Sequence, residues 1–383
     1  MTKRNNVYIF ILTFGVFAII NTEMGVVGIL PLIAKSFHIS VSQSGLLVSL
    51  FALGVAIAGP TMPLLFSGIN RKKVMLLVLS VFILGNIISA FTTNFIVLLI
   101  ARVIPAFFQP IYCSLAFTVA AASADSREEA TKAVSKVIMG VSAGMVLGVP
   151  ITSFIAGVTS LRVAMLFFAL VNIIALIATL IFVPSMPVNS RLSYGAQISV
   201  LKKSITWLSI AAVILLNGAV FGVYSYLSEY LGTVTNIPYK TISLILLIYG
   251  VANIVGNIIA GKLLVKDARK FVTFFPFALG VVYIILFLMG QFTLPMVLIT
   301  LFWGILAGAG ANINQYWIAS AAPEAPDFAN GLFLTSANLG TTIGTTICGL
   351  FISGIGTKYV VLGGVLFTIL SLIFILLRNY TNK

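Results

Sequence analysis

Acidic residues are scarce in this chain, whose 383 residues include 8 aspartates and glutamates and one histidine. All charged residues together make up 8% of it, whereas a soluble globular domain carries roughly a quarter. So few charged side chains exclude a soluble fold of this length and indicate lipid as the solvent. The shortage of carboxylate and imidazole groups also argues against catalytic pairs and metal clusters. We therefore expect no enzyme, no bound metal and no cofactor.

Three further features are missing. The only cysteines, Cys113 and Cys348, fall inside apolar runs, so we expect free buried thiols and no disulfide. A phosphate-binding P-loop is absent, so ATP does not drive the protein directly. Long polar loops are absent too, and this argues against a receptor with a soluble domain.

Hydrophobic residues make up 60% of the chain, with a mean hydropathy of +1.16. They form long blocks rather than the alternating pattern of a membrane β-barrel, so the spans are helical. Because about 20 apolar residues cross a bilayer, we predict twelve transmembrane helices, over residues 7–33, 43–66, 74–92, 95–122, 134–158, 161–183, 205–230, 241–264, 271–290, 295–320, 329–355 and 358–378.

Lysine and arginine residues indicate how the chain is oriented. The sequence holds 22 of them and has a formal net charge of +14. If the N-terminus is cytoplasmic, 17 of them fall on the cytoplasmic side, Arg102 lies within a helix, and only four fall on the outer side: Lys35, Arg162, Lys240 and Lys358. Cytoplasmic loops of membrane proteins carry such an excess of cations, so we expect both termini inside. Cations scattered among short loops suit anionic lipid headgroups and do not suggest nucleic acid.

The chain repeats itself weakly. Residues 53–56 and Gly59 match residues 249–252 and Gly256, at offsets of 196 and 197 residues. Two parallel repeats are an arrangement of transporters whose substrate site lies between the halves near the membrane midplane. We therefore expect an N-terminal six-helix bundle over residues 1–183, a cytoplasmic linker over 184–204 and a C-terminal six-helix bundle over 205–383.

Glu23 and Arg102 are charged residues that fall deep inside predicted spans. Glu23 lies sixteen residues after Val7, about 24 Å along a helix, and Arg102 lies eight residues after Asn94, about 12 Å. Their helices run in opposite directions, so both residues reach the outer half of the membrane at similar depth. Such charges are costly in lipid and usually face a partner or a wet cavity. We favour proton coupling at Glu23 and Arg102; the alternative is a structural ion pair.

Polar side chains in the other spans predict a mostly apolar substrate cavity with scattered hydrogen-bonding groups. Gln109, for example, lies seven residues after Arg102 and shares its helix face. A cavity of this kind suits a small neutral or amphipathic molecule, while polar packing between helices is the alternative for each residue. The predicted cavity residues are Asn21, Gln109, Tyr112, Asn217, Tyr224, Asn312 and Gln315.

Glycine recurs every four residues in the fifth predicted helix and again in its counterpart in the second half. Small residues on one helix face allow close approach of another helix, and a proline can bend the helix that contains it. We expect these faces to meet across the boundary between the halves. The residues are Gly140, Gly144, Gly148 and Pro150 in the first half, and Gly340 and Gly344 in the second.

Several of these segments resemble one known family, the major facilitator superfamily. Residues 21–31 resemble the opening of the arabinose-efflux, chloramphenicol-resistance and purine-efflux branch of its twelve-helix drug/proton antiporters. Arg102 is similar to the buried arginine of helix 4, and residues 140–150 to the antiporter motif of helix 5. The cytoplasmic loop keeps the basic end of a further motif, Arg71-Lys72-Lys73, with Ser67 and Gly68 where Asp and Arg are usual.

The resemblance implies a monomeric, multi-pass protein in the plasma membrane of a bacterial cell. It implies a proton-coupled exporter that moves small amphipathic molecules, drugs among them, by alternating access. Its partners would be the small-molecule substrate, protons and the lipid bilayer. Export of one specific metabolite, such as a purine nucleobase, a nucleoside or a sugar, stays open as an alternative. A proton-coupled uptake symporter and a non-transporting membrane receptor stay open as well.

Overall fold

A computed structural model describes residues 3–123, 127–187, 195–324 and 326–381, and every regular element within them is helical. Contacts divide the chain into two units. The first holds residues 1–26 and 57–193, and the second holds residues 27–56 and 194–383. The predicted linker lies partly outside the described residues, and the division into bundles 1–183 and 205–383 stays a prediction.

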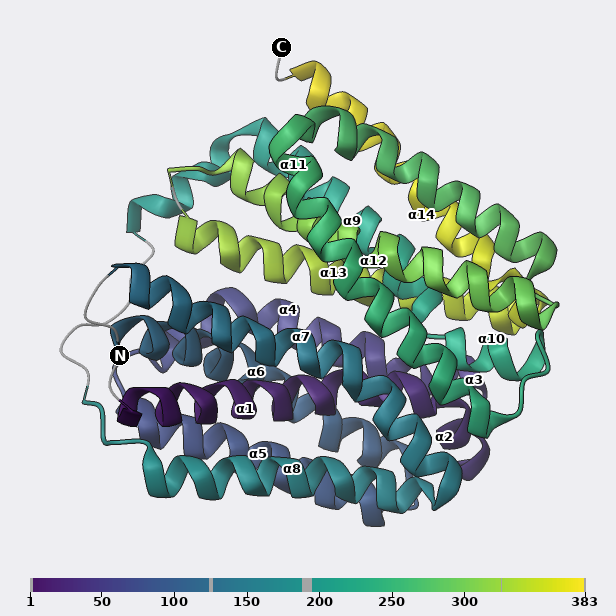
Figure 1. The fold of residues 1–383 in the computed structure, drawn as a ribbon. Coiled ribbons are helices and arrows are strands. Elements are labelled where there is room, and N and C mark those ends of the chain that lie inside the picture. Colours follow the sequence, from purple (N-terminus) through teal and green to yellow (C-terminus); the bar gives the residue numbers. More distant parts are fainter. Residues whose placement is uncertain (1–2, 124–126, 188–194, 325, 382–383) are drawn as a thin grey trace. The chain divides into compact units, whose positions relative to one another are not determined.

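The first unit is a bundle of long helices. It consists of α1 (Lys3–Gly25), the end of α4 (Leu46–Leu65), α5 (Arg71–Phe91), α6 (Phe95–Ala122), α7 (Arg127–Val158) and α8 (Leu161–Phe182). Helices α5 and α8 lie side by side (Figure 1). Large apolar side chains such as Phe10, Leu84 and Phe182 are more than half exposed, as expected for surfaces that face lipid.

The second unit combines a short N-terminal segment with the C-terminal helices. Its elements are η1 (Val26–Ile29), α2 (Leu30–Ser36), α3 (Val41–Ser44), the start of α4, η2 (Gly195–Lys202), α9 (Ser204–Tyr224), α10 (Leu227–Thr233), α11 (Tyr239–Met289), α12 (Thr293–Ala321), α13 (Pro326–Ile355), η3 (Thr357–Tyr359) and α14 (Val360–Thr381).

Helix α11 accounts for two predicted spans. Eleven helices of the described chain are long and apolar enough to cross a membrane, and α11 is 51 residues long. Its backbone leaves helical geometry at Asp267, where Figure 1 shows the helix turning back on itself. The Asp267 carboxylate accepts a hydrogen bond from the backbone N–H of Lys270 at 3.0 Å and so caps the second part. Counting the two parts of α11 separately gives the twelve predicted spans.

The first predicted span, over residues 7–33, lies within one apolar membrane-length segment, Val7–Ser36, but that segment is not a single regular helix. Helix α1 stops at Gly25, and after η1 the chain restarts as α2 with Pro31 in its first turn. Residues 27–56 then pack with the C-terminal helices inside the second unit. Thr335 and Thr342 of α13 donate hydrogen bonds to the backbone oxygens of Ala56 and Ser49, each at 3.1 Å.

The glycine face of α7 packs directly against α1. A Cβ atom added to Gly140 would lie 2.3 Å from the Thr13 backbone oxygen, and one on Gly144 would lie 2.7 Å from Ile20 Cβ. Real Cβ atoms do not come this close, so only glycine permits the contact. Helix α7 therefore lies nearly backbone to backbone on α1, as small-residue faces allow.

The second unit uses the same device between α13 and α9. A Cβ on Gly340 would lie 2.4 Å from the Ile214 backbone oxygen, and one on Gly344 would lie 2.5 Å from that of Gly218. The predicted close approach is thus present in both repeats, but its partner differs from our expectation. Each glycine face packs on a helix of its own unit, α7 on α1 and α13 on α9.

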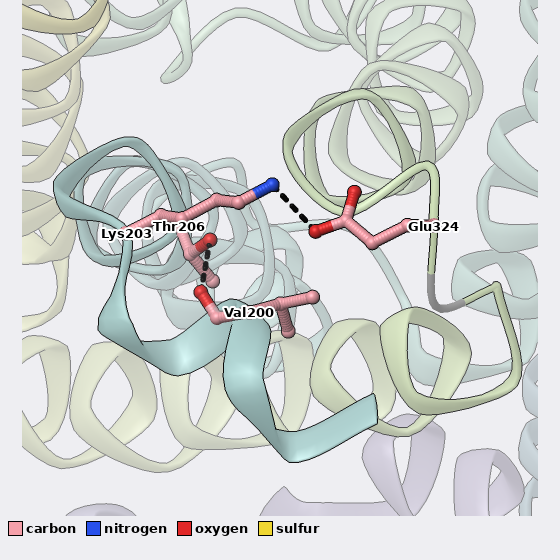
Figure 2. A network of polar contacts seen from close by, with 4 residues as sticks. All are labelled: Val200, Lys203, Thr206 and Glu324. Atoms are coloured by element: carbon pink, nitrogen blue, oxygen red, sulfur yellow. Dashed lines mark hydrogen bonds and ion pairs between the residues drawn. The ribbon is translucent and has the colours of Figure 1, made fainter. Parts of the chain in front are cut away.

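The segment before α9 is held by polar contacts at its end. Figure 2 shows the Lys203 ammonium facing the Glu324 carboxylate, and Thr206 Oγ1 donating to the Val200 backbone oxygen at 2.8 Å. The hydrogen bond from Lys203 holds the pKa of the Glu324 carboxyl below its ordinary value. This exposed pair ties the start of α9 to the connection between α12 and α13.

The close contact of α7 with α1 predicts a strong effect of one added methyl group. Gly144→Ala should destabilise the protein by about 1–3 kcal/mol, the usual cost of overpacking. Thermal unfolding of the purified protein in detergent measures the change. The control is Gly261→Ala in α11, where an added Cβ meets nothing within 4 Å. That variant should be unchanged or slightly more stable, because alanine favours helix. Equal unfolding temperatures for the two variants would contradict the close-packing interpretation.

Candidate functional site

Glu23 lies in the last turn of α1, where it meets α6 inside the first unit. Its side chain is half-buried, and its Oε2 accepts a hydrogen bond from Gln109 Nε2 at 2.6 Å. Gln109 is only 6% exposed, so the amide is held in place by packing. When such a carboxylate gains or loses a proton inside the membrane, its hydrogen bond to the fixed amide changes, and with it the contact between α1 and α6.

Arg102 of α6 reaches the same turn of α1. It is 2% exposed, and its Nη2 donates to the Thr22 backbone oxygen at 2.9 Å, one residue before Glu23. The two opposite charges are close enough to interact electrostatically. The structure therefore brings together Glu23, Arg102 and Gln109, three residues that the sequence placed at similar depth or on one helix face.

Thr22 is the centre of a hydrogen-bond network that sequence reasoning missed. Asn172 Nδ2 of α8 donates to Thr22 Oγ1 and to the Phe168 backbone oxygen, each at 2.9 Å. Asn86 Nδ2 of α5 also donates to Thr22 Oγ1, at 3.4 Å. Both asparagines interrupt otherwise apolar runs, and that interruption was the available signal. The network fixes the turn of α1 that carries Glu23 from three neighbouring helices.

Two other predicted cavity residues of this unit are fully buried. Asn21 is 0% exposed and faces α7, where a Cβ on Gly148 would lie 3.2 Å from Asn21 Oδ1. Neither of its amide atoms has a hydrogen-bond partner among the described residues. Tyr112 is also 0% exposed, with its hydroxyl against the backbone of Gly15. Tyr112 of α6 therefore packs against α1 in this structure, and its role in a substrate cavity stays a prediction.

The predicted asparagines of the second unit bind neighbouring helices. Asn217 Nδ2 of α9 donates to the Ala337 backbone oxygen at 2.6 Å and to Thr341 Oγ1 at 2.9 Å. Asn312 Nδ2 of α12 donates to Asn257 Oδ1 at 2.6 Å. These contacts support the packing alternative for both residues. Gln315, in contrast, is exposed.

Tyr224 belongs to a buried aromatic cluster in the second unit. Its ring stacks on Tyr249 with centroids 4.4 Å apart, and Trp303 meets both rings edge-on. Trp303 is 0% exposed and Tyr224 is 5% exposed. Tyr249 and Trp303 were not predicted, because a tyrosine or a tryptophan in an apolar helix gives no signal of its partners.

The basic turn at Arg71, Lys72 and Lys73 begins α5. Cations at a helix N-terminus are disfavoured by the helix dipole, and here Lys72 points elsewhere. Its Nζ donates to the backbone oxygen of Leu180 at 2.9 Å, at the C-terminal end of α8, where a cation is favoured. Helix α7, for its part, continues through the buried Pro150 without a break.

Comparison with known sequences decides the family. The Major Facilitator Superfamily profile matches residues 12–326 and 206–383. An MFS-type transporter of Bacillus subtilis, YtbD, is 32% identical to this chain, with 92% of this chain and 90% of that protein covered.

This chain belongs to the major facilitator superfamily.

Other members of the superfamily match over similar lengths. The inner membrane transport protein YdhP of Escherichia coli is 26% identical, with 95% of this chain and 94% of that protein covered. A probable sugar efflux transporter of Helicobacter pylori is 27% identical, with 92% and 90% covered. The chain is therefore a multi-pass transporter of the cell membrane with a small-molecule substrate, and not an enzyme.

Solved structures show the same fold. The nucleoside transporter NupG aligns over all of both chains with a TM-score of 0.78 at 15% identity. A bacterial homologue of the lysosomal transporter Spinster aligns with a TM-score of 0.81, also at 15% identity, over all of this chain and 98% of that one. The major facilitator fold predicted from the sequence is confirmed.

The network around Thr22 predicts that Asn172 stabilises α1. Interhelical hydrogen bonds in membranes are worth about 0.6 kcal/mol on average and at most about 1.7, so Asn172→Ala should destabilise the protein by about 1–2 kcal/mol. Unfolding in detergent tests this. The control is Asn338→Ala, whose amide donates only to the oxygen of Leu334 one turn earlier in its own helix. Equal stability of the Asn172 variant and wild type would exclude the network as a support of α1.

Proposed function

We propose that this transporter is a proton-coupled exporter of small amphipathic molecules, with Glu23 as the proton-carrying group. The observation that carries the proposal is the contact of the Glu23 carboxylate with Gln109 Nε2 at 2.6 Å, beside the buried Arg102. Ionisable residues inside a membrane mark proton and substrate pathways more often than they serve packing alone. The carboxylate has a fixed donor on one side and a cation nearby on the other.

The chemistry at this site links a proton to the position of α1. An ionised carboxylate accepts from Gln109 and balances the charge of Arg102. A protonated carboxyl no longer balances that charge, and one of its oxygens becomes a donor. The Arg102 guanidinium also holds the Thr22 backbone oxygen, so a change in its interaction with Glu23 acts on the end of α1. A substrate that competes with the proton for this site gives exchange in opposite directions.

The names of relatives support export over uptake. The proteins of Helicobacter pylori and Pasteurella multocida that match 92% and 97% of this chain are described as probable sugar efflux transporters. The resemblance of residues 140–150 to the antiporter motif supports the same direction. A sugar or another single metabolite is the second candidate cargo, and an uptake symporter is the alternative that the transport direction tests.

Glu23→Gln tests the coupling. It keeps the size of the side chain and its capacity to accept from Gln109, but it cannot gain or lose a proton. We expect efflux driven by an imposed pH gradient in proteoliposomes to fall at least about tenfold, a loss of roughly 1.4 kcal/mol or more in coupling. Substrate exchange at equal pH on both sides should persist. Labelled sugars, nucleosides and a fluorescent amphipathic cation serve as the test panel.

The matched control is Glu229→Gln in α10, which removes another carboxylate from a span of the second unit. It should leave gradient-driven efflux intact. Full gradient-driven transport by Glu23→Gln would overturn the proposal. Accumulation inside cells that express the wild type, rather than depletion, would assign uptake instead of export.

A further inference from the structure

A small polar cavity lies between three helices of the second unit and is lined by none of the residues proposed for proton coupling. Its volume is about 130 Å³, and a single water needs only roughly 10–15 Å³ of such space. Figure 1 shows the C-terminal end of α14 beside the bend of α11, where the cavity is found. The lining residues are Arg269, Tyr316, Trp317, Ser320, Arg378 and Asn379. Among the described residues, two arginines and no carboxylate line it.

Arg378 is the buried cation of this cavity. It is 4% exposed, and its guanidinium carbon lies 3.7 Å from the centre of the Trp317 ring. Its Nη2 donates to Ser320 Oγ at 2.8 Å and to the Trp317 backbone oxygen at 3.2 Å. A buried charge is costly unless it is paired, and none of these contacts supplies a negative charge.

Two residues that line the cavity each carry a buried N–H group without a described protein acceptor. Arg378 Nε and Trp317 Nε1 have no hydrogen-bond partner among the described residues, and Trp317 is also 4% exposed. Buried donors in folded proteins almost always have a partner. The unpaired donors lie beside a cation, and no described lining side chain carries a negative charge. Such surroundings favour an anion.

Arg269 supplies a second guanidinium from the opposite side. It lies just after the bend of α11, is exposed, and donates from Nη2 to the Asn379 backbone oxygen at 3.1 Å. Asn379 Nδ2 in turn donates to Thr273 Oγ1 at 3.0 Å. These bonds hold the start of the second part of α11 against the end of α14, so the two guanidinium groups stay on one cavity.

We propose that Arg269, Arg378 and Trp317 form a binding site for a phosphate-type oxyanion. Guanidinium groups bind phosphate oxygens through paired, charge-assisted hydrogen bonds, more specifically than lysine does. By the predicted topology the site faces the cytoplasmic leaflet, whose surface carries anionic phospholipids. The same chemistry would accept a water-soluble phosphate. The site is separate from Glu23 and does not depend on the proposed transport function.

A titration of the purified full-length protein in neutral detergent tests the site. Phosphatidylglycerol, phosphatidylcholine with the same acyl chains, or inorganic phosphate is added, and the unfolding temperature is followed. We expect saturable stabilisation by phosphatidylglycerol and little by phosphatidylcholine. Arg269→Gln should weaken the apparent affinity about fivefold, since one cation beside an anionic lipid contributes about that factor. Arg269→Lys should retain part of the affinity.

The control is Lys266→Gln. Lys266 lies three residues before Arg269 and carries the same charge, but its side chain does not line the cavity. It should bind phosphatidylglycerol as the wild type does. Arg378→Gln should lose the effect, and if that variant does not fold, Arg269→Gln decides alone because its only described side-chain bond is to Asn379. If inorganic phosphate stabilises the protein, and Arg269→Gln weakens that stabilisation, the site binds a soluble phosphate.

Two results would overturn the proposal. One is an equal loss of apparent affinity for phosphatidylglycerol in Lys266→Gln and Arg269→Gln, which would show a general effect of surface charge. The other is equal stabilisation by phosphatidylcholine and phosphatidylglycerol, which would reduce Arg378 to a residue that caps the end of α12.

Discussion

Hydrocarbon offers no hydrogen bonds, and this constraint determines where most polar groups of the spans can lie. A donor or charge inside the membrane must find its partner within the protein. The turn of α1 at Thr22 and Glu23 shows the result, because side chains of α5, α6 and α8 all converge on it. Polar groups of four helices satisfy each other at this turn, which also carries the Glu23 carboxylate.

The repeat in the sequence corresponds to a repeated contact in the structure. Helix α7 lies on α1 in the first unit, and α13 lies on α9 in the second, each through glycines spaced four residues apart. Lipid provides no hydrophobic drive for such contacts, so van der Waals contact between bare backbones stabilises them. The partner helices differ in what they carry, since α1 holds Glu23 and α9 holds Asn217. The two units thus share one way of packing their helices but place different polar side chains on them.

Much of this was accessible from the sequence. Apolar run lengths predicted the spans, and the depths of Glu23 and Arg102 along their helices predicted that the two residues meet. Partner choice was not accessible, because it depends on how each helix is rotated about its axis. Asn86 and Asn172 were visible as polar interruptions, but nothing in their spacing pointed to Thr22. For the same reason the glycine face of α7 was assigned to the wrong neighbour.

The bend at Asp267 has a mechanical consequence. The two parts of α11 are joined by one non-helical residue, Asp267, whose side chain caps the second part. With so little chain between them, the two crossings must stay side by side at this end. Arg269, two residues after the bend, ties the same end to Asn379 of α14.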